Sequence, residues 1–275
     1  MNKRRWIINV GVAFFVWFAP ASSGVFAQET HLHHVPQSAG VPEVLFQAKM
    51  TVPDDIGPGK SFTIDIHISD DKGRKVSAFD VFQEKLMHLI VVSDDLGFFE
   101  HLHPEYQGDG HFKTTAILPS AGAYTLFSDY QPAGQKEQIS VLKLRMKGAR
   151  KSSETEDMKA TEKMVQGMRI RMGLSPKIPR VNEEAIIGFY LKQIDGKPVT
   201  GLGPYLGEKG HLVIIGKSKT LSVRNYLHAH AMKEGEASEI KFTTRFPNKG
   251  LYKLWCQFNR NGRILTADFW VNIQR

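Results

Sequence analysis

Six of the eleven histidines in this chain of 275 residues belong to one pattern that occurs twice. In each copy a single histidine stands at the head of an apolar run, and a His-X-His pair follows it. Residues two apart on a β-strand point to the same face, so each pair presents two imidazoles together. Imidazole is a good ligand for copper and zinc, and three imidazoles can share one ion. The candidate ligands are His88, His101 and His103 in the first copy and His211, His228 and His230 in the second.

The single histidine and the pair are expected to meet across a β-hairpin. If the turn at Asp94–Gly97 closes a regular hairpin, His88 falls opposite His103. Directly opposed side chains have Cβ atoms about 4.5–5.5 Å apart, which is close enough for three rings to converge. The second copy has a longer loop, in which His211 can lie opposite His230. A register slip of one residue would move the single histidine to the other face.

Two interpretations of the histidines are open. Neutral imidazoles without a carboxylate or thiolate suit reversible binding of copper or zinc, at metal–nitrogen distances of about 2.0–2.1 Å for zinc. Thioethers select Cu(I), so Met87 and Met232 beside the pattern favour copper, although methionines there also suit ordinary packing. Alternatively the clusters are structural, with each ring hydrogen-bonded to carbonyl or carboxylate groups. The tract at 31–34 holds three more histidines, which can bind metal weakly or belong to a polar tail.

The histidine pattern is part of a longer internal duplication. The segment Leu118–Phe127 corresponds to Phe246–Trp255, with a proline, a glycine and a tyrosine at the same offset. Two repeats of roughly a hundred residues have the size of domains rather than of solenoid units.

Short strands separated by turn signals predict the fold of each repeat. Apolar residues alternate with polar ones over 61–69, which predicts a strand with one buried face, and the apolar run at 86–92 predicts a central strand. Clusters of glycine, proline and aspartate punctuate these strands. The predicted fold class is all-β, with two tandem antiparallel β-sandwich domains.

The N-terminus has the features of a secretory signal peptide. Basic residues precede an apolar stretch too short to span a bilayer comfortably, and Val25 and Ala27 suit cleavage before Gln28. The mature protein should therefore be periplasmic or secreted, without stable membrane insertion after cleavage. We expect a signal peptide at 1–27, a disordered histidine-containing N-terminus at 28–42, β-sandwich domains at 43–146 and 167–275, and a polar linker at 147–166.

Composition and motifs argue against several other classes of protein. The net charge is +8, but the basic residues are scattered and do not alternate with stacking aromatics, so we expect no nucleic-acid partner. Nucleophile-elbow, His-Glu-X-X-His, P-loop and dinucleotide motifs are missing from the sequence, so we expect no enzyme activity. The only cysteine, Cys256, corresponds to Ser128 in the first repeat and is predicted to be a buried structural thiol.

Three segments of the first repeat resemble a poorly characterised group of secreted bacterial proteins with tandem β-sandwich domains and a His-Leu-His-Pro motif, often encoded near metal-handling genes. These segments are Met87–Ser93, His101–Pro104 and Gly122–Phe127. The resemblance covers both domains and implies a cupredoxin-like or immunoglobulin-like sandwich. The second repeat departs from the motif, because Ala231 stands where the first repeat has Pro104.

Two functions follow as hypotheses. The first is an extracytoplasmic protein that binds copper or zinc for buffering or delivery, with the metal ion as its partner. The alternative is a non-catalytic module that binds an envelope protein, with structural histidine clusters.

Overall fold

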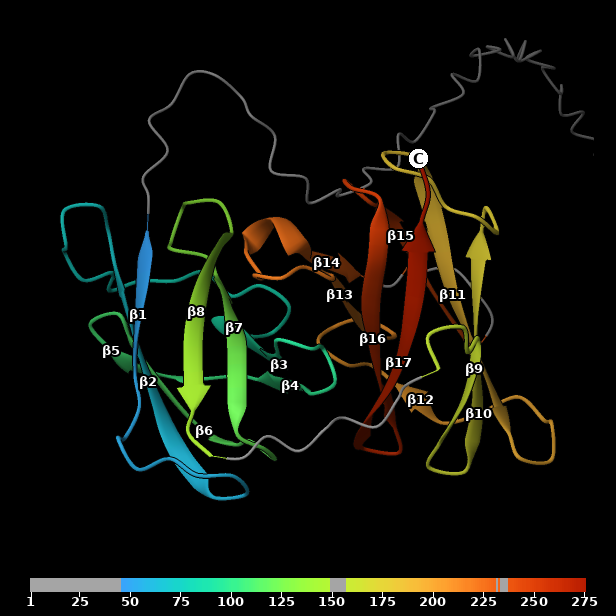
Figure 1. Cartoon of the computed structure of the whole chain (residues 1–275), viewed down its shortest axis with the longest axis horizontal. Helices are drawn as coiled ribbons and strands as arrows, with labels where there is room; N and C mark the ends of the chain where they lie inside the picture. The colour runs from blue at the N-terminus through green and yellow to red at the C-terminus, as the bar shows by residue number, and fades with distance from the viewer. Residues whose placement is uncertain (1–45, 149–156, 231, 233–236) are drawn as a thin grey trace, which may run out of the picture. The chain divides into compact units, whose positions relative to one another are not determined.

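The computed structural model describes residues 46–148, 157–230, 232 and 237–275 (Figure 1). The predicted signal peptide at 1–27, the N-terminus at 28–42 and the centre of the predicted linker lie outside these residues. Residues 33–275 form one compact unit, which therefore contains both repeats. Within the part of the chain that the structure describes, no helix is long and apolar enough to span a bilayer.

The first repeat is a sandwich of two antiparallel sheets. One sheet has the order β1-β2-β6-β5, and the other has the order β4-β3-β7-β8. Its strands are β1 (Gln47–Thr51), β2 (Ser61–Ser69), β3 (Met87–Ser93), β4 (Phe99–Leu102), β5 (Glu105–Gly108), β6 (His111–Ile117), β7 (Gly122–Tyr130) and β8 (Gln138–Met146).

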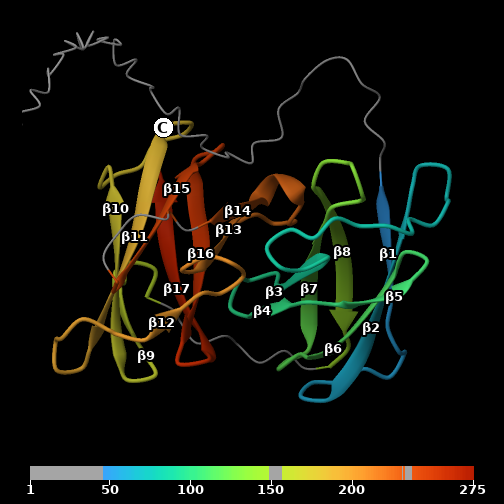
Figure 2. The same ribbon diagram turned by 180° about the vertical axis from the view of Figure 1, so that it is seen from behind.

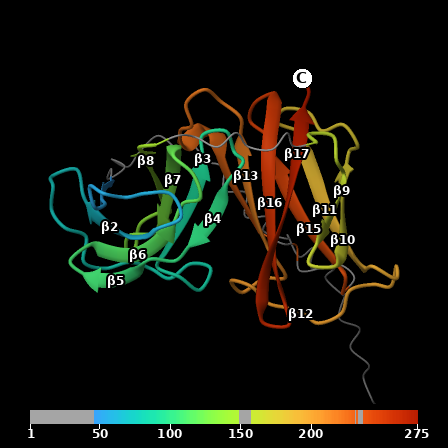
Figure 3. The same cartoon turned by 60° about the horizontal axis from the view of Figure 1, so that its bottom comes forward.

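The second repeat follows the same plan. One sheet has the order β15-β11-β10-β9, and the other has the order β12-β16-β13-β14, with β17 also paired to β16. Figure 3 shows β16 and β17 as a long hairpin. The elements are β9 (Glu162–Val165), β10 (Met168–Ser175), β11 (Glu184–Gln193), β12 (Leu202–Gly203), β13 (His211–Gly216), the 3₁₀ turn η1 (Val223–Asn225), β14 (Tyr226–His230), β15 (Glu239–Arg245), β16 (Gly250–Arg260) and β17 (Arg263–Ile273).

The predicted fold class is confirmed, since all the paired strands are antiparallel and form two sandwiches in tandem. The strand predicted from alternation is β2, whose isoleucines are buried while His67 is exposed. One boundary differs from the prediction: residues 162–165, expected in the linker, form the edge strand β9 against β10. A short edge strand buries few side chains, so a polar composition does not distinguish it from a linker.

A tyrosine near the start of the same strand is anchored in the same way in both repeats. The Tyr124 hydroxyl on β7 donates to the Ser120 carbonyl at 2.7 Å, and the Tyr252 hydroxyl on β16 donates to the Asn248 carbonyl at 2.8 Å. This bond back to the backbone four residues upstream is the tyrosine corner of immunoglobulin-type sandwiches. It also confirms the duplication at the level of individual hydrogen bonds.

The two strands that carry the single histidines, β3 and β13, are buried on both faces. In β3, Leu89 and Val91 belong to the core of the first sandwich, whereas Ile90 and Val92 belong to another apolar cluster. That cluster also includes Val213 of β13, so it draws on both repeats. Figure 2 shows β3 beside β4 in the first repeat and β13 beside β14 in the second. We call the cluster the inter-repeat core; it comprises Ile90, Val92, Leu96, Phe127, Val213, Ile215, Leu221, Tyr226, Trp255 and Trp270.

We expect the two tyrosine corners to stabilise their sandwiches to a similar degree. Tyr252→Phe removes one partly buried hydrogen bond, and Tyr124→Phe removes the equivalent bond together with a longer one to Ser120 Oγ, so each should lower the free energy of unfolding by about 1 kcal/mol. Urea denaturation measures this loss. Tyr190→Phe is the matched control, because that ring stacks under Arg171 at 4.6 Å and the described residues show no hydrogen bond to its hydroxyl. A corner variant as stable as the control would contradict the expectation.

Candidate functional site

The pairing of β3 with β4 determines which histidines meet. Ile90 lies opposite His101 and Leu89 opposite Leu102, so the same register places His88 opposite His103. In the second repeat His211 lies directly opposite His230. Both predicted registers are therefore confirmed.

The three histidines of the first repeat converge. One ring nitrogen from each of His88, His101 and His103 lies within 4.8 Å of the other two. The closest pair is His88 Nδ1 and His101 Nε2, at 3.0 Å. The side chains of His228 and His230 lie outside the described residues, so the second predicted set of ligands is placed by its strands alone.

A tight turn holds His88 from the first repeat. Phe82 and Lys85 exchange backbone hydrogen bonds around Gln83 and Glu84, whose φ angles are 47° and 64°. Positive φ at both central residues is typical of a type I′ turn. The turn directs the Phe82 carbonyl to His88 Nε2 at 3.2 Å, and the Phe82 ring packs edge-on against the His88 ring.

Residues of the second repeat complete the surroundings of the cluster. His101 Nδ1 donates to Gln257 Oε1 at 2.7 Å. The His211 ring lies 4.7 Å from the His101 ring and stacks 6.0 Å from the His88 ring, measured between centroids. Tyr205 lies edge-on to His101 and His211. The histidines of the first repeat therefore sit against the second repeat rather than in a site of their own.

Burial keeps the rings neutral. Burial lowers the pKa of His101 well below its usual value, and the neighbouring His103 and His88 lower it further, against a hydrogen bond to Gln257 that raises it. Burial, with a contribution from Lys85, lowers the pKa of His103 to about 4. Neutral imidazole is the form that binds metals. His103 Nε2 is buried and has no hydrogen-bond partner among the described residues.

The number of N–H protons on His88 and His101 determines whether the two rings can bind a cation between them. A neutral imidazole has one N–H, and the oxygens of Phe82 and Gln257 only accept, so in one pair of tautomers each ring gives its N–H to one of these oxygens. In that pair of tautomers His88 Nδ1 and His101 Nε2 face each other at 3.0 Å with a lone pair each, and one cation can bind both. For metal–nitrogen distances of about 2.0–2.1 Å this separation corresponds to an angle of roughly 95° at the ion.

The orientation of one amide group decides between two states of the cluster. If the Gln257 amide is turned over, its N–H₂ donates to His101, His101 donates to His88, and His88 donates to Phe82. Every bond in that chain is satisfied by neutral groups, with no lone pair left for an ion between His88 and His101. With the oxygen of Gln257 towards His101, as in this structure, the pair is ready for a cation.

Met87, Cys256 and the remaining described histidines are not part of the cluster. Met87 is fully buried in the core of the first sandwich and accepts a hydrogen bond from Ser128, so it does not support a preference for copper. Cys256 is a free buried thiol, as predicted, and burial raises its pKa. His111 stacks on the exposed His67.

Sequence reasoning missed Gln257, although a signal for it exists. Gln257 follows Tyr252 by five residues, and Asp129 follows Tyr124 by five. Both stand in strands that are mostly buried, and they pair with His211 and His88 respectively. A polar residue that recurs at one position of a buried strand has a partner to satisfy.

The sequence matches the family described as Domain of unknown function (DUF8832), over residues 43–144 and 163–275. The chain belongs to this family. One matched range falls on each repeat. No curated protein matches the sequence.

Some solved structures share a distant likeness with this chain. They include a mutant of Salmonella alpha-2-macroglobulin (12% identity, TM-score 0.29, covering 86% of this chain and 15% of that one) and a tetra-tandem repeat from the extending region of a large adhesion protein (7%, 0.28, 84% and 49%). Invasin, a bacterial integrin-binding protein, is another (10%, 0.24, 81% and 39%). The chain spans less than half of each. At these TM-scores the likenesses bear neither on its fold nor on its function.

We expect the stability of the metal-free protein to fall as the pH falls from about 6.5 to about 4. In the unfolded chain a histidine takes up its proton near pH 6.5, whereas folded His103 stays neutral down to about pH 4. The unfolded state then binds more protons, which favours unfolding in this window. Melting temperatures in a chelating buffer, at half-unit steps of pH, measure the slope.

His103→Gln should flatten this slope, since it removes a group that takes up a proton between about pH 6.5 and pH 4 in the unfolded chain but not in the folded protein. His67→Gln, at an exposed histidine, is the control and should keep the wild-type slope. Equal slopes for the His103 variant and the wild type would contradict the expectation.

Proposed function

We propose that this protein binds copper or zinc through His88, His101 and His103, outside the cytoplasm, for buffering or delivery of the ion. One observation carries the proposal: three ring nitrogens lie within 4.8 Å of one another, in a setting that keeps the rings of His101 and His103 neutral. The proposal involves binding and release, not catalysis. Its extracytoplasmic part rests on the signal peptide predicted at 1–27.

The second set of histidines belongs to the proposal through its strands. His211 and His230 are paired as His88 and His103 are, and His228 occupies the position of His101. We therefore propose His211, His228 and His230 as ligands of a second ion.

The alternative function is a non-catalytic module that binds an envelope protein and uses its histidines for structure. A specific observation favours it: with the Gln257 amide turned over, the hydrogen bonds from Gln257 through His101 and His88 to Phe82 are all satisfied without metal. The two functions differ in how the protein responds to an ion.

Titration calorimetry with Zn²⁺ and Cu²⁺ tests the metal proposal. The starting protein is mature protein in which the histidines at 31–34 are serine, because a histidine-rich tract binds metal weakly. We expect saturable binding near neutral pH that is lost at the first site in His101→Ala plus His103→Ala. The matched control is His67→Ala plus His111→Ala, which removes two stacked histidines from β2 and β6, in the other sheet of the first sandwich.

Thermal unfolding separates the two functions. At free ion about 100 times Kd, binding should add about 2.7 kcal/mol and raise the melting temperature by about 5–10 °C. The structural alternative predicts no response to ion or chelator, together with a lower melting temperature for the His101 and His103 variant in metal-free buffer. An unsaturable titration in the starting protein would reject metal binding.

A further inference from the structure

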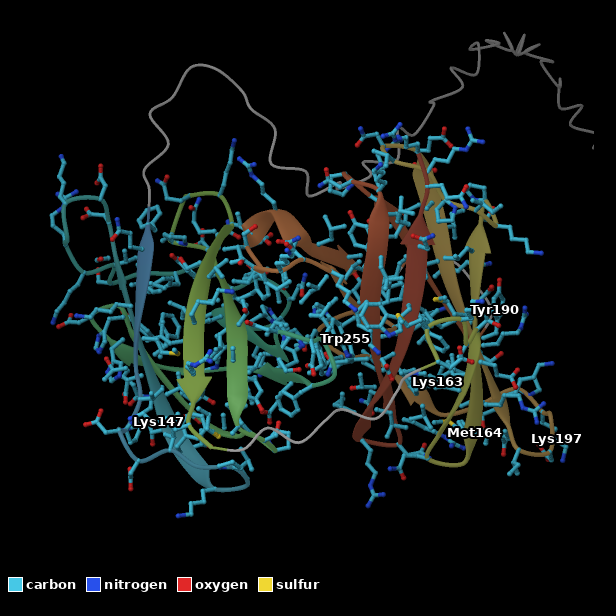
Figure 4. All side chains as sticks on the ribbon, in the orientation of Figure 1. Lys147, Lys163, Met164, Tyr190, Lys197 and Trp255 are labelled. Carbon is cyan, nitrogen blue, oxygen red and sulfur yellow. The ribbon has the colours of Figure 1, made fainter. Side chains whose placement is uncertain are left out.

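The two repeats pack through contacts that are exchanged between equivalent residues. Phe99 of the first repeat stacks on Trp255 of the second, with ring centroids 4.8 Å apart. Tyr226 of the second repeat stacks on Phe127 of the first at 4.9 Å. Phe99 and Tyr226 each stand two residues before the His-X-His pair, and Phe127 and Trp255 each stand three residues after the corner tyrosine. Figure 4 labels Trp255 on its strand.

Such a reciprocal exchange is the signature of an interface with two-fold symmetry. The turns before the single histidines follow the same symmetry: Tyr205 and Glu208 exchange backbone hydrogen bonds as Phe82 and Lys85 do. The duplicated chain therefore forms an internal counterpart of a symmetric dimer. Its apolar centre is the inter-repeat core, where Ile90, Val92, Val213 and Ile215 are fully buried.

The histidine cluster lies at this interface and depends on both sides of it. The three candidate ligands come from the first repeat, but the hydrogen-bond acceptor that orients His101 is Gln257 of the second. Gln257 is itself only 6% exposed, so its amide has little freedom to serve other partners. A metal-bound histidine almost always donates its other N–H to an acceptor of this kind, which fixes the ring and tunes its basicity.

The geometry points to an inter-repeat metal centre, in which Gln257 is the positioning residue for His101 and ion binding fastens the two sandwiches together. This inference rests on the proposed function. An ion bound to His101 Nε2 would keep the proton of that ring on Nδ1, where it is donated to Gln257 Oε1. Ion binding would therefore stabilise the hydrogen bond that links the two repeats. Metal binding and inter-repeat packing are then coupled, and each strengthens the other.

Variants of Gln257 test the positioning role by Zn²⁺ titration of the full mature chain. Gln257→Leu keeps the volume but removes the acceptor, and should weaken binding about 10- to 100-fold. Gln257→Glu restores an acceptor and should bind at least as tightly as the wild type, because a carboxylate accepts a stronger bond from the imidazole N–H. Ile64→Val is the control: it thins the core of the first sandwich, outside the inter-repeat core, and should leave Kd within about 3-fold, since it touches neither the histidines nor their acceptor.

The outcomes separate this inference from the proposed function. If the wild type does not bind, both fail. If the wild type binds and Gln257→Leu binds equally well, the positioning role fails while the metal site stands. A second readout is the Co²⁺ absorption spectrum, which should shift in Gln257→Leu and return in Gln257→Glu, whereas a purely structural defect would leave the spectrum of bound Co²⁺ unchanged.

Tryptophan fluorescence tests whether metal binding stabilises the packing between the two repeats. Beyond residue 27 the chain has two tryptophans, Trp255 and Trp270, both in the second repeat and both in the inter-repeat core. The test uses the variant with His228→Ala and His230→Ala, in which only the ligands of the first repeat are complete. Zn²⁺ should raise its melting temperature by the same amount whether unfolding is followed by tryptophan fluorescence or by circular dichroism. An unchanged fluorescence midpoint beside a raised circular dichroism midpoint would overturn the coupling.

Discussion

Burial of both faces of β3 and β13 is the constraint on which the rest of this structure depends. One face of each strand packs in its own sandwich, and the other packs in the inter-repeat core. A strand enclosed on both sides has no water to solvate polar groups, so every polar side chain on it must find a partner in the protein. His88 and His211 are such side chains, at 1% and 2% exposure. The burial of these two histidines therefore explains why other polar side chains gather around them.

Enclosure also explains the electrostatics of the cluster. Imidazole in water is half protonated near neutral pH, but loss of solvation disfavours the charged ring, and each additional histidine nearby disfavours it further. The rings of His101 and His103 are therefore neutral acceptors, held close together by strand pairing rather than by their own attraction. The contact between His88 Nδ1 and His101 Nε2 can therefore hold either a cation or a hydrogen bond, depending on the tautomers of the two rings.

The duplication also explains how the apolar outer face of β3 is covered. Without the second repeat, the face of β3 that carries Ile90 and Val92 would be an exposed apolar patch, which favours association. The tandem chain satisfies that patch internally, with reciprocal stacking of Phe99 on Trp255 and of Tyr226 on Phe127. The repeats differ next to the single histidines, where Asp129 of the first repeat occupies the position of Gln257 in the second. Burial raises the pKa of Asp129 well above its usual value, whereas the amide of Gln257 offers an acceptor at any pH.

The sequence by itself determined the all-β fold, the duplication and the pairing of the histidines, because strand alternation and hairpin register depend on neighbours close along the chain. Those features are read from residues such as Ile64, Ile66 and His101 without knowing what lies opposite the sheet. Only the tertiary structure decided that Gln257, 156 residues away, completes the surroundings of His101, and that Met87 points into the core instead of to the site. The physical reason is that a strand buried on both faces looks the same in sequence whatever covers it, so the partner on its second face is set by packing between the repeats.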